Sequence, residues 1–150
     1  MNDAYRFIFA EGGPSQITAE VVRRFIAAFQ QKDPSAIPDL VAADCVMEAM
    51  QPAPGGQRVE GYEANVAFWQ AMVVDSVGSF EVEETIICGD RATNRWRYRF
   101  GEGDDGWVRG VTLLVVRDGK IVEALAYAKT APRTALGQGG ALTRSDGAPA

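Results

Sequence analysis

Four strand-forming segments follow one another between residues 80 and 129, and no helical pattern separates them. They are rich in β-branched and aromatic residues, and Gly, Asp and Arg cluster between them. The segments are 80–88, 92–100, 107–116 and 120–129. Strands joined by such short connections pair antiparallel, because a parallel pair needs a longer crossover. This half of the chain therefore predicts an antiparallel sheet.

Helical patterns occupy the part of the chain before these strands. Apolar residues recur every three or four positions over 19–33, and Thr18 is placed to cap this helix at its N-terminus. We expect a short second helix over about 34–41, a first strand over 45–52, and a third helix over 61–77. Helices followed by a run of strands predict an α+β fold.

The composition of the two ends sets the expected limits of this domain. Residues 1–15 are interpreted as an N-terminal arm, because a Gly-Gly-Pro break follows a short apolar patch. Residues 131–150 are rich in Gly, Ala, Pro, Ser and Thr, and we expect a disordered tail there. The folded domain is accordingly expected over 16–130.

The segment NRWRYRF, residues 94–100, alternates polar or charged side chains with rings. Successive side chains of a strand point to opposite faces, so Trp96 and Tyr98 share one face while Arg95 and Arg97 share the other. The arginines could bind a nucleic acid or pair with carboxylates on the neighbouring strand. The net charge of −5 favours the second interpretation, because an acidic surface repels phosphate.

A three-residue turn at 89–91 predicts the register of the two strands on either side of it. This register places Glu84 beside Trp96 on the inner face of the sheet. A two-residue turn would set Glu83 against Trp96, which fits the charge pattern less well. The ion pairs predicted on the outer face are Glu83–Arg97 and Glu81–Arg99.

The inner face is expected to combine aromatic rings with a few polar groups, among them Glu84, Asn94 and Tyr98. A buried carboxylate must be paired or must raise its pKa. Such a surface predicts a pocket for a small molecule. The alternative is that these side chains fill a core, with each polar atom bonded to backbone. The first and third helices would cover the face with Phe25, Phe29, Trp69 and Met72.

The residue inventory excludes several kinds of site. The chain has no histidine, which removes the commonest general base and the commonest metal ligand. Its two cysteines, Cys45 and Cys88, lack the spacing of a zinc site or a disulfide framework. No segment predicts a membrane span or a secretory signal. We therefore expect a cytoplasmic protein without a metal or other cofactor.

Three stretches resemble the SnoaL-like proteins of the nuclear transport factor two and ketosteroid isomerase superfamily. They are FIAAFQQKDPSAIPDLVAADCVMEAM, PAPGGQRVEGYEAN and GVTLLVVRDGKIVEALAY. The resemblance covers about residues 16–130. It implies a cone-shaped, cystatin-like fold in which helices pack on a curved, mostly antiparallel sheet. The superfamily includes isomerases, polyketide cyclases and non-catalytic binding proteins, so the fold alone does not decide the function.

The catalytic residues of ketosteroid isomerase do not carry over to this chain. Phe25 stands at the position of the isomerase tyrosine, and Ala49 stands at the position of its catalytic base. Its second aspartate aligns near Thr112. Glu48 lies one residue before the base position, and it is either a base pointing inward or an exposed residue of the strand.

The segment 107–116 is apolar on both of its faces. Thr112 and Leu114 are expected to face the pocket, and Leu113 the other side of the sheet. Leu125 and Tyr127 would extend the outer apolar patch. A face exposed to water is not usually this apolar, and in this family the outer face is often a homodimer interface. The resemblance thus implies a homodimer.

The leading functional hypothesis is a cofactor-independent cyclase or isomerase that acts on a hydrophobic intermediate of polyketide or terpenoid type. The composition is similar to that of proteins from high-GC bacteria, where such enzymes serve natural product biosynthesis. The alternative is a non-catalytic ligand-binding or dimerisation module. The expected catalytic residues are Glu48, Glu84, Asn94 and Tyr98. The expected substrate-binding residues are Phe25, Phe29, Trp69, Met72, Trp96, Thr112 and Leu114.

Overall fold

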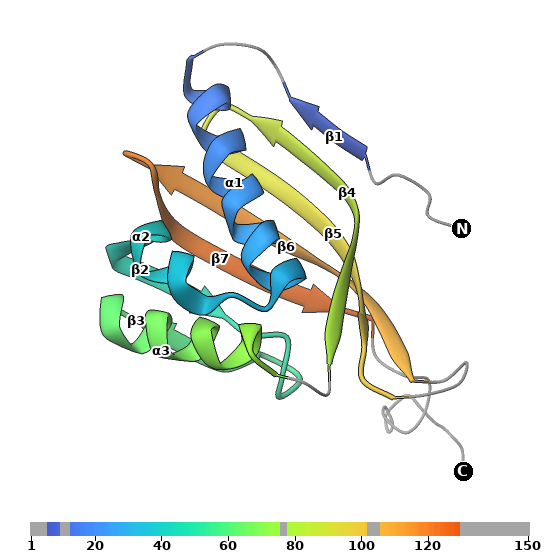
Figure 1. Ribbon diagram of the computed structural model, residues 1–150. Helices are drawn as coiled ribbons and strands as arrows, with labels where there is room; N and C mark the ends of the chain where they lie inside the picture. The colour runs from blue at the N-terminus through green and yellow to red at the C-terminus, as the bar shows by residue number, and fades with distance from the viewer. Residues whose placement is uncertain (1–5, 10–12, 76–77, 102–105, 130–150) are drawn as a thin grey trace.

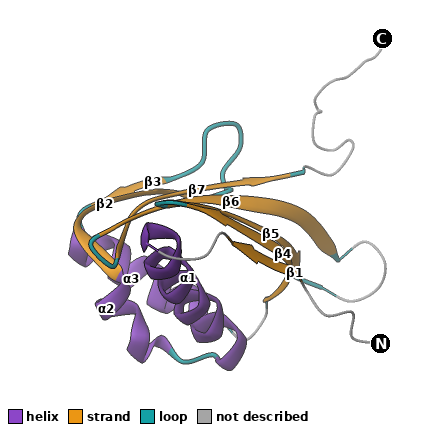
Figure 2. Cartoon of the chain, turned by 90° about the horizontal axis from the view of Figure 1, so that it is seen from above, coloured by secondary structure: helices purple, strands orange, loops and turns teal. Residues whose placement is uncertain are grey.

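The computed structural model describes residues 6–9, 13–75, 78–101 and 106–129. These residues form two layers, with the helices lying against one face of a curved sheet (Figure 1, Figure 2). The predicted α+β class is confirmed. The elements are β1 (Arg6–Phe9), α1 (Gly13–Gln31), a 3-10 turn (Pro34–Ala36), α2 (Ile37–Leu40), β2 (Val41–Glu48), β3 (Arg58–Glu60), α3 (Tyr62–Val73), β4 (Ser79–Cys88), β5 (Arg91–Arg99), β6 (Trp107–Arg117) and β7 (Lys120–Ala128).

The described residues build one sheet of seven strands in the order β1-β4-β5-β6-β7-β2-β3. Within it, β1 runs parallel to β4 and β2 runs parallel to β7, while the other neighbours are antiparallel. The turn from β6 to β7 holds Asp118 and Gly119 at positive φ, 53° and 76°, as a two-residue hairpin turn requires. The four long strands therefore form one continuous surface on which a site can be built.

The first long helix begins earlier than the sequence indicates, and the prediction that Thr18 caps it is wrong. Helix α1 begins at Gly13, and Pro14 suits its first turn because the missing N–H has no helical partner there. Thr18 is buried, and its hydroxyl donates to the carbonyl of Gly89 at 2.7 Å. The Ser15 hydroxyl accepts from the Gly89 N–H at 2.8 Å. These two hydroxyls therefore hold α1 to the turn between β4 and β5.

The other end of α1 is also held by a side chain. Lys32 follows the helix with φ of 56°, and its ammonium donates to the backbone carbonyls of Asp75 and Gly78. Both carbonyls lie in the connection between α3 and β4. Helix α1 is thus attached to the rest of the domain at both of its ends.

Between α1 and α3 the structure contains the predicted helix and strand, but their boundaries differ from the predicted ones. The helix expected over 34–41 is divided into the 3-10 turn and α2, and β2 begins at Val41 rather than at Cys45. The sequence pattern does not predict strand β3. This strand pairs with β2 and lies immediately before α3.

The core lies between the helices and the inner face of the sheet. Cys45 is part of it, and burial, followed by the charge of Asp44, raises the pKa of its thiol to about 12. Across the described ranges, no helix is both long enough and apolar enough to cross a membrane. The largest fully buried apolar side chains are Ile37, Leu40, Leu114, Ile121, Val22, Val41 and Val73.

Candidate functional site

The register between β4 and β5 decides which side chains reach the inner face, and it differs from the predicted one. Cys88 pairs with Arg91, so the turn has two residues, 89–90, instead of three, and at the other end of the strands Phe80 faces Tyr98 and Val82 faces Trp96. Glu83 is an extra residue in β4, at a β-bulge between Val82 and Glu84. The bulge removes the conflict that a two-residue turn would otherwise create between Glu83 and Trp96.

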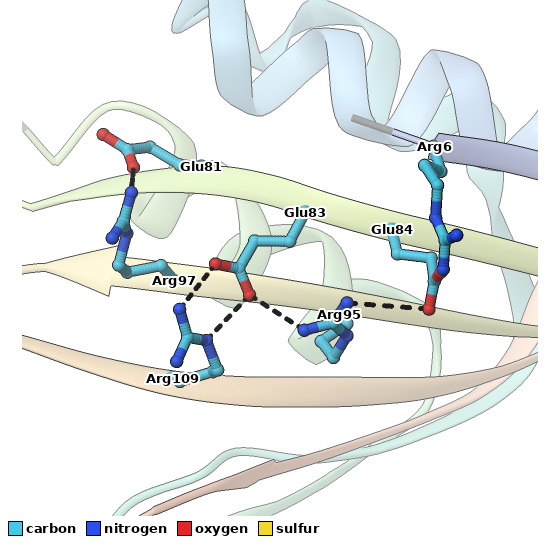
Figure 3. Close-up of polar contacts among 7 residues, drawn as sticks. All are labelled: Arg6, Glu81, Glu83, Glu84, Arg95, Arg97 and Arg109. Atoms are coloured by element: carbon cyan, nitrogen blue, oxygen red, sulfur yellow. Dashed lines mark hydrogen bonds and ion pairs between the residues drawn. The ribbon is translucent and has the colours of Figure 1, made fainter. Parts of the chain in front are cut away.

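The bulge also exchanges the two faces of β4 beyond it. Thr85 and Ile87 are buried under the helices, whereas Ile86 and Cys88 are exposed. The prediction that Glu84 lies beside Trp96 is therefore wrong. Glu84 faces Arg95 across the strands, and its carboxylate pairs with Arg95 at 3.7 Å and with Arg6 of β1 (Figure 3).

The arginines of β5 pair with carboxylates on the outer face, as predicted, but with different partners. Glu83 accepts from Nε and Nη2 of Arg109, both at 2.8 Å, and from Arg95 at 3.3 Å (Figure 3). The hydrogen bond from Arg109 is the main reason that the pKa of Glu83 lies below its ordinary value. A further ion pair on the outer face joins Glu81 and Arg97, at 2.8 Å. These ion pairs together are called the network of the outer face.

A cavity of about 310 Å³ opens between α1, α3 and the inner face of the sheet. Among the described residues, none of those that line it carries an ionisable side chain. Aromatic rings form much of the wall, with centroid separations of 4.8 to 5.5 Å from Trp69 through Phe25, Phe29 and Phe80 to Trp96. The lining residues are Phe25, Ile26, Phe29, Gln30, Met47, Ala49, Met50, Gln51, Gln57, Phe68, Trp69, Met72, Phe80, Val82, Asn94, Trp96, Thr112, Ala124 and Ala126.

Two polar side chains lie together on the sheet side of this cavity. Asn94 and Thr112 are direct cross-strand partners on β5 and β6. The Thr85 hydroxyl donates to Oδ1 of Asn94 at 3.0 Å, and Nε1 of Trp96 donates to Oγ1 of Thr112 at 2.8 Å. The remaining polar residues of the lining are exposed glutamines at 30, 51 and 57, which therefore mark the side open to solvent.

The structure brings most of the predicted binding residues to this cavity. Leu114 is an exception, because its side chain is only 1% exposed and belongs to the core. Its neighbour Thr112 lines the cavity. The predicted residues that line the cavity are Phe25, Phe29, Trp69, Met72, Trp96, Thr112 and, from the predicted catalytic set, Asn94.

The other predicted catalytic residues lie outside the lining. Glu48 pairs with Arg58 at 3.2 Å, whereas Met47 and Ala49 on either side of it line the cavity. The ring of Tyr98 packs on Phe80 with centroids 4.5 Å apart. Glu84 lies in the network of the outer face described above.

Tyr98 occupies a tightly packed position behind the cavity wall. Burial, then the charge of Asp75 and a hydrogen bond to it, raise the pKa of the Tyr98 hydroxyl. That hydroxyl lies against Gly78, where an added Cβ would come within 1.9 Å of the oxygen. A glycine is therefore required at this position for Tyr98 to keep its place.

The predictions from the sequence do not include Thr85 or the cavity residues at the end of β2 and just after it. Uniform alternation along 80–88 places Thr85 on the outer face, and only the bulge turns it to the inner face. Met47 and Ala49 share one parity in the segment VMEAM, which is the signal that could have placed them opposite Glu48. The described residues hold no group of three or more His, Cys, Asp or Glu side chains that could bind a metal ion.

Several solved structures are similar to this chain. A nuclear transport factor two-like protein of unknown function from Mesorhizobium loti is 46% identical, with a TM-score of 0.77, over 82% of this chain and 99% of that chain. A steroid delta-isomerase from Pseudomonas aeruginosa is 17% identical, with a TM-score of 0.64, over 81% and 84% of the two chains. A candidate SnoaL-like polyketide cyclase from Jannaschia sp. CCS1 is 19% identical, with a TM-score of 0.62, over 79% and 90%. The last two likenesses show the fold alone.

Among curated proteins, none matches this chain. The family profile described as a SnoaL-like domain matches residues 22–124. This range includes α3, the four long strands up to Ala124, and most of α1. The profile match and the 46% identical structure agree with the resemblance drawn from the sequence. The chain belongs to the SnoaL-like family and has the nuclear transport factor two-like fold.

Proposed function

We propose that this protein binds a neutral, apolar small molecule of polyketide or terpenoid type in the cavity between α1, α3 and the sheet. The observation that carries the proposal is the composition of the wall, where apolar side chains predominate, most of them aromatic rings and methionines, and the described residues contribute no charge. Burial of apolar surface is the main source of binding free energy in such a site. A charged ligand would lose its hydration without gaining an opposite charge.

A neutral fluorescent probe, N-phenyl-1-naphthylamine, tests this proposal. We expect saturable fluorescence enhancement with one probe bound per chain. Ala126 lines the cavity, so Ala126→Trp fills the space and should weaken binding at least tenfold. Ala67→Trp adds the same ring on the exposed side of α3 and should leave binding unchanged. Equal affinity of the two variants would contradict the proposal.

A second candidate function is a cofactor-independent cyclase or isomerase. It is favoured by Asn94 and Thr112, because two hydrogen-bond donors directed at one carbonyl oxygen stabilise the charge that develops during enolisation. Enclosure by the aromatic wall would hold a flexible substrate in a reactive shape. This candidate does not depend on Glu48, Glu84 or Tyr98, which lie outside the lining.

Proton exchange distinguishes the enzyme from the binding protein. β-Tetralone is a neutral ketone of suitable size, and its α C–H bond exchanges with D₂O through the enolate. An enzyme should accelerate this exchange above the buffer rate in NMR spectra, with solvent as the base, and Asn94→Leu should remove most of the acceleration. Exchange at the buffer rate by a protein that binds the ketone would leave ligand binding as the function.

The outer face of the sheet is proposed to join two copies of the chain. Cross-strand partners place Ile8, Ile86, Thr93, Leu113 and Leu125 in one row across five strands. Ile8, Ile86 and Leu113 are 40–46% exposed, which is unusual for neighbouring large apolar side chains.

Light scattering after size exclusion tests the homodimer at micromolar concentration. We expect a dimer for the native protein and a monomer for Leu113→Arg. Val74→Arg changes an exposed residue on the helical side and should remain dimeric. A native protein that is monomeric under these conditions would contradict the proposal.

A further inference from the structure

We infer that Thr85 and Trp96 hold Asn94 and Thr112 with their free N–H and O–H hydrogens toward the cavity, so that the site selects ligands with a neutral acceptor oxygen. The suitable classes are ketones, aldehydes, esters and lactones. The inference rests on the proposed binding function and adds the chemistry of the group that the site recognises. It assigns a positioning role to Thr85, which does not line the cavity.

The pair Trp96–Thr112 has only one possible direction. An indole N–H donates and cannot accept, so Oγ1 of Thr112 must be the acceptor of the 2.8 Å bond. The hydroxyl hydrogen of Thr112 then remains available, and no described residue accepts it. Because Thr112 lines the cavity, this hydrogen can be donated to a ligand.

The ring of Trp96 is held in the position that this bond requires. Gly110 lies opposite Trp96 on β6, and an added Cβ there would come within 2.3 Å of the indole ring. The ring is 3% exposed and contacts Phe80 with centroids 5.1 Å apart. The indole N–H is therefore fixed in its direction toward Thr112.

The pair Thr85–Asn94 has a direction for a different reason. Thr85 is 0% exposed, and Oδ1 of Asn94 is the only acceptor that the described residues offer to its hydroxyl. If the amide were reversed, Nδ2 would donate to Thr85 and the hydroxyl hydrogen would be buried without a partner. The amide therefore keeps Oδ1 toward Thr85. Its Nδ2 donates to no described residue and is left for the cavity.

The two donors can reach the same atom of a ligand. Asn94 and Thr112 are directly opposite each other on adjacent strands, where side chains are close neighbours. Carboxylates would find no cation in the described lining. A ligand N–H group would meet Oδ1 of Asn94 and Oγ1 of Thr112, each of which already accepts one hydrogen bond. A single neutral oxygen that accepts two hydrogen bonds is the group that matches this arrangement.

The test compares two probes that differ only by oxygen against CH₂, namely 2-acetylnaphthalene and 2-isopropenylnaphthalene. Their dissociation constants are measured by displacement of N-phenyl-1-naphthylamine. Thr85→Val removes the hydroxyl at nearly constant volume, and Thr85→Ser keeps it. We expect the preference for the ketone to fall about three- to tenfold in Thr85→Val, the range of one neutral hydrogen bond. The preference should be retained in Thr85→Ser.

The affinity for the alkene separates positioning from a general structural effect. It should change less than twofold in Thr85→Val, since the apolar wall is untouched. Thr112→Val removes the second donor and should also lower the preference for the ketone, which keeps the inference testable if Thr85→Val fails to fold. A preference that is unchanged in both valine variants would overturn the inference and leave the proposed function intact. Failure of both probes to bind the native protein would overturn the proposed function, and the inference with it.

Discussion

Asn65 shows how a single amide can join three elements. It is 0% exposed at the start of α3, and its Nδ2 lies 2.9, 3.2 and 2.8 Å from the carbonyl oxygens of Cys45, Val59 and Gly61. These carbonyls belong to β2, to β3 and to the residue that precedes the helix. The side chain thus holds one wall of the cavity to the edge of the sheet.

Asn65→Asp should destabilise the fold in a pH-dependent manner. A carboxylate would face three carbonyl oxygens without a donor, so the folded state raises its pKa above the unfolded value of about 3.9. The loss of stability is then small below pH 4 and grows as the pH rises. Urea denaturation should give a deficit of about 3 kcal/mol at pH 7.5 and a smaller one at pH 4. An equal deficit at both pH values would contradict this explanation.

The two cysteines should differ sharply in reactivity. Cys45 is buried with a pKa of about 12, so almost none of it is thiolate at pH 8, whereas Cys88 is exposed. We expect iodoacetamide to modify one thiol in the folded protein and two in guanidinium. Mass spectrometry of the intact chain and of its peptides would check the number and the position.

The bulge in β4 decides the composition of the site at the level of elements. It directs Glu83 and Glu84 to the outer face and turns Thr85 toward Asn94. Without it, a carboxylate would lie on the cavity side of the sheet. The bulge therefore separates an ionic outer face from a neutral inner face within one strand.

Glu83→Gln tests how much the ion pairs of Glu83 at the bulge contribute to the free energy of unfolding. Contact with Arg109 lowers the pKa of Glu83, so its contribution is present above the unfolded value of about 4.3 and is lost as the pH falls through the folded value. We expect the variant to lose about 1 kcal/mol at pH 7 and less as the pH falls below the unfolded value. Glu81→Gln is the matched control, since among the described residues Glu81 pairs with Arg97 only, and its side chain is more exposed than that of Glu83. It should cost less at pH 7, in the same chemical denaturation experiment.

The order of elements could be predicted from the sequence, but the faces of β4 could not. The strands over 80–129 were predicted to within about a residue because alternation and turn residues are local signals. The doublet Glu83–Glu84 breaks the alternation, but local pattern does not tell a bulge from a longer turn. The cavity was inferred from rings on β5 and the helices, whereas the Asn94–Thr112 pair depends on register across β5 and β6.

At the scale of the whole molecule, the cavity is a volume that the core leaves unfilled. Its existence depends on the distance between α1 and the curved sheet, which no local pattern encodes. Apolar space of this kind lowers stability, because wall atoms lose contacts that a filled core would provide. A ligand-binding function and maximal stability are therefore opposed in this domain.

Ala126→Leu should reveal this opposition. The larger side chain extends into the cavity and adds apolar contacts, so the free energy of unfolding should rise by about 1 kcal/mol. The same change should weaken binding of N-phenyl-1-naphthylamine several-fold. Thermal denaturation and probe titration on one preparation would check both signs. A variant that is less stable than the native protein would indicate that this part of the wall is already closely packed.

The attachment of α1 at both ends limits the ways in which a ligand can enter and leave the cavity. Ser15 and Thr18 hold one end to the β4–β5 turn, and Lys32 holds the other to the connection after α3. Any outward tilt of α1 about one of its ends would therefore break hydrogen bonds at the other end. A ligand should instead enter the cavity past the exposed glutamines, and rotation of individual side chains should be enough to let it through. Bound and free ligand would then exchange quickly. The residence time of a ligand would depend on its contacts with the cavity wall more than on any motion of the backbone.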